Sequence, residues 1–366
     1  MSIRESMMSV YRNEMPERPV VGIYTRYLSR GEMERKARNN GLGIIAYVPL
    51  TSQIGPPWHM LDGFLSEVRN VDLSVRYLYR HGSLYEQRKY HTPAGELTAE
   101  IGKSAGMGSE HIAQHYIRSK DDYRVMDCIV RNTVLSANTE LFRRTSHELG
   151  EDGIVMGRMD RTPYQKLLIE LAGAEQFLID LYVENEVVEQ LLDTMGKRYR
   201  EQVDLAMESD AEIIWIPDNV TADMTPPENY EKYLMPHYQY CVKCAKETGK
   251  MVVVHCDGKI RPLSRYINEI GFDAIESLSD PMISGDMTFL EAVKAFPGKA
   301  ILPNFPSCLS LSPEETIRNY VENLKKQAHN IPLMLQISED LEDNSYERVI
   351  PIILEAMYGK YESSIS

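Results

Sequence analysis

The stretch VVVHCDGKI, residues 252–260, combines the pattern of a buried strand with residues that carry out chemistry. Consecutive valines are typical of a parallel strand covered on both faces, and this run ends in His255, Cys256 and Asp257. Because side chains alternate between the faces of a strand, we expect His255 and Asp257 on one face and Cys256 on the other. Two interpretations stay open: a catalytic site at the mouth of a parallel barrel, or a strand that leaves the core through polar loop residues.

Similar short apolar runs recur along the chain and alternate with longer helical segments, which indicates βαβ units and a parallel sheet. An open doubly wound sheet and a (β/α)8 barrel both satisfy this pattern. The number of strands and the lack of a G-x-G-x-x-G motif after the first strand favour the barrel. The predicted strands are residues 42–50, 153–160, 212–219, 251–257, 274–278, 300–305 and 333–340.

The first part of the chain is less regular. Residues 75–103 alternate in places and contain the turn TPAG at residues 92–95, which predicts β-hairpins, and residues 120–135 predict a helix. The predicted fold class is therefore α/β, a (β/α)8 TIM barrel with an N-terminal extension of β-hairpins and helices. We expect one barrel domain over residues 1–366, with residues 1–150 carrying the N-terminal elaboration.

Composition excludes several classes of function. The 366 residues carry a formal net charge of −14, which argues against binding to nucleic acid or to anionic membranes. No signal-peptide pattern and no apolar run long enough to span a bilayer are found. An odd number of cysteines, five, indicates free thiols in a reducing compartment, so we expect a cytoplasmic protein.

Polar residues follow each predicted strand, and in a parallel barrel the carboxyl ends of the strands meet at one mouth. We predict catalytic roles for His255, Asp218 and Asn219, and substrate binding by Asp160, Glu276 and Asn304. For any one of these residues the simpler interpretation is a polar loop or a helix cap. For the set, a site is favoured. The pair in CVKC, residues 241–244, is not expected to contribute, because it lies late in a helix and therefore at the other end of the barrel.

The second half of the chain resembles the uroporphyrinogen decarboxylase superfamily. The order Pro-Glu-x-Tyr, Pro, Gly-Lys, His-x-Asp-Gly and Gly-x-Asp-Ala within residues 225–281 carries the resemblance, with residues 300–324 and the hairpin KYHTPAGELT at residues 89–98. The superfamily implies a single (β/α)8 barrel that commonly dimerises. Its decarboxylases use no metal and carry an Arg-rich N-terminal motif of the form MRQAGRY, which this sequence lacks.

The other branch of the superfamily holds cobalamin-dependent methyltransferases, such as those acting between methylcobalamin and coenzyme M. Those bind zinc through His-x-Cys and a distant Cys; here the matching positions are His255-x-Asp257 and, in QISEDLED at residues 336–343, Glu339. A set of His255, Asp257 and Glu339 can hold zinc, and metal can equally be absent. The resemblance implies a methyl transfer between a small methylated compound and cobalamin carried by a partner corrinoid protein.

Two alternatives to corrinoid-linked methyl transfer remain. One is a metal-free decarboxylase of the uroporphyrinogen decarboxylase type. The other is a barrel used for binding or assembly without catalysis.

Overall fold

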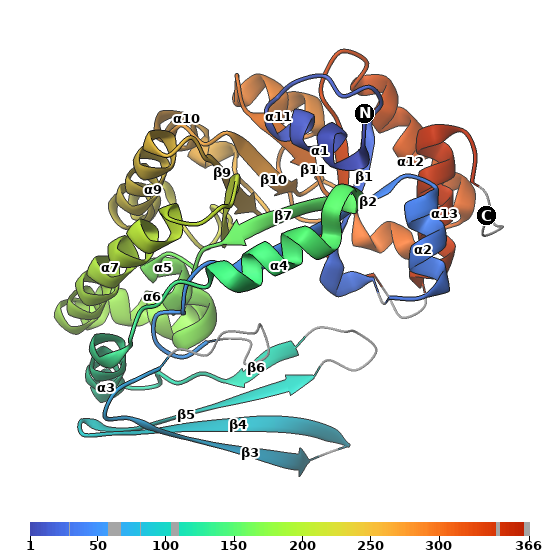
Figure 1. The fold of residues 1–366 in the computed structure, drawn as a ribbon. Helices are drawn as coiled ribbons and strands as arrows, with labels where there is room; N and C mark the ends of the chain where they lie inside the picture. Colours follow the sequence, from blue (N-terminus) through green and yellow to red (C-terminus); the bar gives the residue numbers. More distant parts are fainter. Residues whose placement is uncertain (29, 58–66, 81, 104–109, 342–344, 362–366) are drawn as a thin grey trace.

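The computed structural model describes residues 1–28, 30–57, 67–80, 82–103, 110–341 and 345–361. Its centre is a sheet of eight parallel strands in the order β11-β10-β9-β8-β7-β2-β1-β12, surrounded by helices (Figure 1). This is the predicted (β/α)8 barrel. The strands are β1 (Val20–Tyr24), β2 (Leu42–Pro49), β7 (Gly153–Arg158), β8 (Ile213–Val220), β9 (Met251–Cys256), β10 (Ala274–Leu278), β11 (Ala300–Pro303) and β12 (Met334–Ile337).

The barrel is closed between β11 and β12 by only a few contacts. Asn304 and Gln336 form a single parallel bridge, and the Phe305 amide donates to the Gln336 carbonyl at 2.7 Å. Both hydroxyl and amide of Ser338 donate to Asn304 Oδ1, at 2.8 and 3.0 Å. The hydrogen bonds of Ser338 to Asn304 therefore complete the barrel, because regular strand pairing between β11 and β12 is limited to one bridge.

Alternation along the strands divides the core into two clusters. The larger lies between the strands and the helices and includes Ile214, Ile216 and Cys256. The smaller fills the barrel interior and includes Trp215 and Val253. Helix α1 (Ile3–Tyr11) belongs to the inner cluster through Met7, Met8, Val10 and Tyr11, so the amino-terminal helix closes the bottom of the barrel.

The helices that cover the barrel follow their strands in the usual βα order. Among the described residues they are α2 (Glu32–Asn39), α4 (Thr139–Leu149), α5 (Pro163–Lys166), α6 (Ala174–Val183), α7 (Asn185–Met207), α8 (Pro227–Asn229), α9 (Met235–Glu247), α10 (Ser264–Ile270), α11 (Phe289–Ala295), α12 (Glu314–Gln327) and α13 (Ser345–Tyr358). Short π-helical turns, Leu167–Leu171 and Tyr230–Leu234, extend α5 and precede α9. None of the described helices is both long and apolar enough to cross a membrane.

A second, antiparallel sheet is inserted between β2 and β7 and lies to one side of the barrel (Figure 1). Its strands are β3 (Asp72–Arg80), β4 (Ser83–Thr92), β5 (Gly95–Lys103) and β6 (Glu110–Gln114), and helix α3 (Lys120–Asn132) packs against it. Thr92 pairs with Gly95 across the β4–β5 turn, as the TPAG motif predicts. The predicted hairpins and helix are confirmed.

All seven predicted barrel strands are present, and the structure adds an eighth. Strand β1, with sequence VVGIY, is short, and its five residues are all buried. Residues 1–150 therefore hold two barrel strands, β1 and β2, in addition to the inserted sheet.

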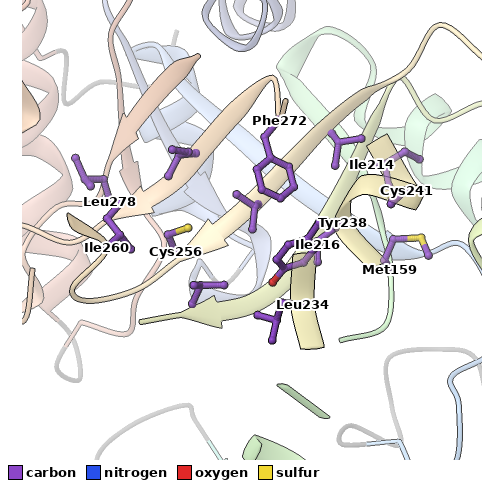
Figure 2. Packing of buried hydrophobic residues seen from close by; sticks show 14 of the residues in the cluster. Met159, Ile214, Ile216, Leu234, Tyr238, Cys241, Cys256, Ile260, Phe272 and Leu278 are labelled. Carbon is purple, nitrogen blue, oxygen red and sulfur yellow. The ribbon is translucent and has the colours of Figure 1, made fainter. Parts of the chain in front are cut away.

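The expected orientation of Cys256 is confirmed. Cys256 belongs to the cluster between strands and helices that also holds Ile216 and Tyr238, and Figure 2 shows its side chain beside Ile260. Cys241 lies in the same layer on α9, near the amino-terminal end of the strands, and burial raises the pKa of its thiol. The CVKC pair thus takes no part in the mouth.

Candidate active site

A polar cavity of about 300 Å³ lies at the carboxyl ends of the barrel strands. Four of the predicted site residues line it: Asn219, His255, Asp257 and Glu339. The other predicted site residues do not line the cavity: Asp160, Asp218, Glu276 and Asn304. The cavity therefore contains part of the predicted set together with residues that sequence reasoning did not single out.

His255 is held from below by Glu276, the residue beside it in the β9–β10 pairing. The distance from His255 Nδ1 to Glu276 Oε1 is 2.6 Å. Burial, the largest influence, lowers the pKa of His255, but the charge and hydrogen bond of Glu276, with the charge of Asp257, outweigh it, so the pKa is raised. Because Glu276 takes Nδ1, Nε2 is the ring nitrogen available to a ligand in the cavity.

Glu276 itself is completely buried and does not line the cavity. Besides His255, it accepts hydrogen bonds from the Tyr24 hydroxyl, at 2.6 and 2.7 Å, and from Trp215 Nε1 at 2.6 Å. Three donors on one carboxylate fix its position. Its place in the structure is that of a positioning group for His255 rather than a substrate ligand.

Two carboxylates, Asp257 and Glu339, line the cavity together with His255. Asp257 Oδ1 accepts a hydrogen bond from Ser279 at 2.8 Å. Burial, followed by the charge of Asp257, raises the pKa of Glu339, and Ser307, His255 and Asn304 act in the opposite direction. Glu339 is thus a carboxyl group that keeps its proton to a higher pH than an ordinary glutamate.

Another side of the cavity is built around Arg161. Its guanidinium donates to Glu170 Oε1 at 2.9 Å, to Asn219 Oδ1 at 3.1 Å and to the Pro217 carbonyl. Glu170 lies in the π-helical turn, a form of helix often found at functional sites. Burial raises its pKa, but Lys166 and the arginines outweigh this, so the pKa is lowered and Glu170 is ionised.

Aromatic side chains form a further wall. The rings of Tyr47 and Trp215 have centroids 4.9 Å apart, and the Trp215 ring meets the His255 ring edge-on at 5.9 Å. Tyr24 lies 5.5 Å from Tyr47, edge-on, and stacks at 6.1 Å on Tyr27. These rings exclude water from one side of the imidazole.

Backbone irregularity accompanies the site. The β8–β9 register shifts between Ile216 and Val220, and the β10–β11 register shifts between Ile275 and Leu278. Within these intervals Asn219 has a φ of 48° and Ser277 has a φ of 59°, backbone angles that residues other than glycine seldom adopt. Such bulges redirect side chains at the rims of barrels, and strained residues of this kind cluster at functional sites.

Asp218, a predicted catalytic residue, points away from the cavity into the helix layer. It is completely buried and accepts hydrogen bonds from the amide and hydroxyl of Thr162, at 2.9 and 2.6 Å, and from the Tyr238 hydroxyl at 2.6 Å. Burial, the largest influence, raises its pKa despite these bonds. Its contacts join β8 to the helices around it.

Asp160 and Asn304 also lie outside the cavity lining. Asp160 accepts from Lys166 Nζ, at 2.8 Å to both oxygens, and from the Ile54 amide at 2.7 Å. Asn304 takes part in the barrel closure through Ser338. Both predicted substrate ligands are therefore placed as supports beneath or beside the mouth.

The predicted metal set does not fit a metal ion in this arrangement. Within the described residues, no three His, Cys, Asp or Glu side chains are grouped so that they could hold one. Glu342 and Asp343, in the stretch matched to the distant ligand, lie outside the described residues.

Sequence reasoning missed Tyr24, Trp215 and Arg161. Trp215 and Arg161 carried a detectable signal, since Trp215 shares the alternating face of β8 with Asn219 and Arg161 directly follows β7 and Asp160. Tyr24 ends the one strand that was not predicted. Its role depends on a contact with Glu276, which lies 252 residues away in the sequence, and no local pattern indicates such a contact.

The fold and this mouth define the class of protein, a (β/α)8 barrel with a polar cavity at the carboxyl ends of its strands. The chain belongs to the uroporphyrinogen decarboxylase (URO-D) family, whose sequence model matches residues 98–333, more than half of the chain. The resemblance stated from the motifs is thereby confirmed. No curated protein matches the sequence.

Among solved structures, a methyltransferase from Methanosarcina mazei matches 99% of this chain and 100% of its own, with a TM-score of 0.59 and 13% sequence identity. A glycoside hydrolase family 5 enzyme from Prevotella bryantii matches 99% of both chains, with a TM-score of 0.42 and 11% identity. A xylose isomerase domain protein from Planctomyces limnophilus matches 94% of this chain and 97% of its own, with a TM-score of 0.40 and 10% identity. The first of these shares the barrel fold.

Proposed function

We propose that this protein is a corrinoid-linked methyltransferase that moves a methyl group between a small methylated compound and cobalamin carried by a partner corrinoid protein. The observation that carries the proposal is His255, a histidine with a raised pKa whose Nδ1 is held by a buried carboxylate and whose ring lines the cavity. This is the arrangement of a general acid, because the protonated ring can give the Nε2 proton to a leaving atom.

In the direction of demethylation, the bond between the methyl carbon and its heteroatom breaks and the electron pair stays on the heteroatom. His255 donates the Nε2 proton to that atom, which leaves as a neutral group. Glu276 stabilises the imidazolium before the transfer and keeps Nδ1 protonated after it. The reduced corrinoid, when bound, supplies the nucleophile that takes the methyl group.

The size of the cavity fits a small substrate and an external partner. About 300 Å³ is the lower end of the range for small-molecule sites, and it is too small to enclose a corrin ring as well. The macrocycle would therefore meet the methyl group from outside the mouth. Tyr47 and Trp215 would pack against the body of the substrate, and Arg161 with Asn219 would hold its polar end.

A decarboxylase of the family's metal-free type is the second candidate. Arg26, Arg158 and Arg161 line the cavity and would bind substrate carboxylates. Five acidic side chains line it as well, however: Glu110, Glu170, Asp257, Glu339 and Asp340. This excess of carboxylates disfavours a substrate with many negative charges.

Methyl exchange with free cobalamin tests the proposal. The protein is incubated with reduced cobalamin and a panel of small O-, S- and N-methyl compounds, and methylcobalamin is followed by its absorption spectrum. We expect formation with at least one compound, and loss of that activity in His255→Ala. Release of carbon dioxide from a carboxylated ring, with no methyl exchange, would replace the proposal by the second candidate.

Metal analysis tests the zinc prediction separately. The protein is purified without added metal, beside the His255→Ala variant. Because no group of side chains that could hold a metal ion is found among the described residues, we expect no stoichiometric zinc in either. Zinc that is present in the protein and lost in the variant would make His255 a ligand through Nε2 and would contradict this expectation.

A further inference from the structure

Strand β3 is the outermost strand of the inserted sheet (Figure 1). All nine residues of its inner edge pair with β4, from Asp72 opposite His91 to Arg80 opposite Ser83. Among the described residues no strand pairs with its other edge. An open edge of this length presents a row of unpaired backbone groups, which proteins normally shorten, charge or cover.

The apolar face of β3 is also uncovered. Cross-strand pairing places Leu73, Tyr90 and Leu97 in one row over β3, β4 and β5. Tyr90 and Leu97 are buried in the main core, whereas Leu73 is 39% exposed. The residues that follow Leu73 on the same face of β3 are exposed as well: Val75 at 38%, Tyr77 at 66% and Tyr79 at 75%. The apolar face of the sheet therefore extends onto β3, where the main core no longer covers it.

When the order of residues in β3, DLSVRYLYR, is reversed, its apolar face and its two ends match the original, while Arg76 meets Arg76 and Ser74 meets Leu78 on the other face. In an antiparallel pair centred on Arg76, Leu73 meets Tyr79 of the other strand, and Val75 meets Tyr77. Asp72 meets Arg80, so opposite charges lie at both ends of the pair. Apolar and opposite-charge pairs of this kind each stabilise an antiparallel sheet.

We propose that β3 pairs antiparallel with β3 of a second copy of this chain, about a twofold axis at Arg76. The pairing joins the two inserted sheets into one sheet of eight strands. Each apolar and charged pair occurs twice, as an isologous interface requires. Within the part of the chain that the structure describes, the opposite edge, β6, stays unpaired, and its Glu110 lines the active-site cavity. The interface therefore leaves both cavities accessible to a partner, and it does not depend on which reaction the protein catalyses.

Position 76 provides a direct test of the register. In an antiparallel pair, opposed Cα atoms lie about 4.5–5.5 Å apart, within the span of a disulfide. Only the residue on the axis faces its own copy, so Arg76→Cys is expected to form a disulfide-linked dimer under mild oxidation. The control Ser74→Cys, which would face Leu78, is expected not to cross-link. Both are made in a Cys308→Ser background, because Cys308 is an exposed thiol.

Light scattering gives the second measurement. The unchanged protein is expected to be a dimer, and Val75→Lys and Tyr77→Lys are each expected to be monomers with unchanged circular dichroism. Tyr182→Lys, which alters a 90% exposed tyrosine on α6, is the matched control and is expected to stay dimeric.

Three results would overturn the proposal. A monomeric unchanged protein with no cross-link at position 76 would exclude the interface. A dimer that resists both lysine variants would place the contact elsewhere. A monomer whose β3 variants lose methyl transfer only to a corrinoid protein, and not to free cobalamin, would assign the strand to that partner instead.

Discussion

Glu276 and Asp218 are both completely buried carboxylates at the carboxyl ends of barrel strands, and each accepts hydrogen bonds from several donors. They differ in what those donors touch. Glu276 holds His255, which reaches the cavity, whereas Asp218 holds Thr162 and Tyr238, which do not. Burial and satisfied hydrogen bonds therefore do not separate a functional carboxylate from a structural one. The face of the strand does, because it decides which layer the side chain enters.

The largest expected effect is on the rate after loss of His255. Removing a general acid typically costs about 10²–10⁴-fold in rate, so His255→Ala is expected to lower kcat by that amount. The variant also leaves the buried Glu276 without this partner, so the thermal midpoint of unfolding is expected to fall, and kcat is compared per folded molecule. The matched variant is Asp218→Ala, in which kcat per folded molecule is expected to persist. Equal losses of kcat in the two variants would contradict the division between the two faces.

The next effect is on stability. Asp218→Ala leaves the Thr162 amide and the Thr162 and Tyr238 hydroxyls without their buried acceptor, at a cost of about 1–3 kcal/mol for each group left unsatisfied. We expect the free energy of unfolding, measured in urea, to fall by about 3 kcal/mol in total. Asp223→Ala, on the loop after the same strand, removes a carboxylate that pairs with Lys259 at the surface. It is expected to change stability by less than about 0.5 kcal/mol.

A smaller effect concerns the pH dependence. The pKa of His255 is raised, so the protonated fraction, and the rate that depends on it, should fall as the pH rises through a value above 6.5. Glu276→Gln removes the charge that outweighs burial, so burial should then move this limb of the kcat profile below pH 6.5. Rescue of the rate at low pH would distinguish positioning from structural damage. A limb that stays in place would show that another group titrates.

The smallest effect separates neighbours on one strand. Burial raises the pKa of the Cys256 thiol, with the charges of Glu276 and Asp218 acting in the same direction, so little thiolate forms at neutral pH. Iodoacetamide on the native protein is expected to label the exposed Cys308 and to leave Cys256 unmodified, as read by peptide mass. Cys256→Ala should keep kcat within about twofold. Rapid labelling of Cys256 would mean that its thiol is not buried between the strands and the helices.

Much of the fold could be predicted because its signals are local. Seven strands were evident from apolar runs bounded by helical segments, and the opposite orientation of Cys256 and His255 follows from alternation. The same alternation, applied to β8, would have placed Asp218 in the helix layer and Trp215 in the barrel. Alternation does not predict that Glu276 lies beside His255, because that contact depends on the register between β9 and β10.

By itself the sequence determined that this chain forms a parallel barrel of the URO-D family with His255 at its mouth. Strand and helix periodicity depend on neighbouring residues, and family motifs keep their order along the chain. Only the tertiary structure decided that Tyr24, Trp215 and Glu276 converge on one imidazole, and that Asp160 and Asn304 act as supports. These contacts join residues from opposite ends of the chain, and burial then sets the protonation of the groups it encloses.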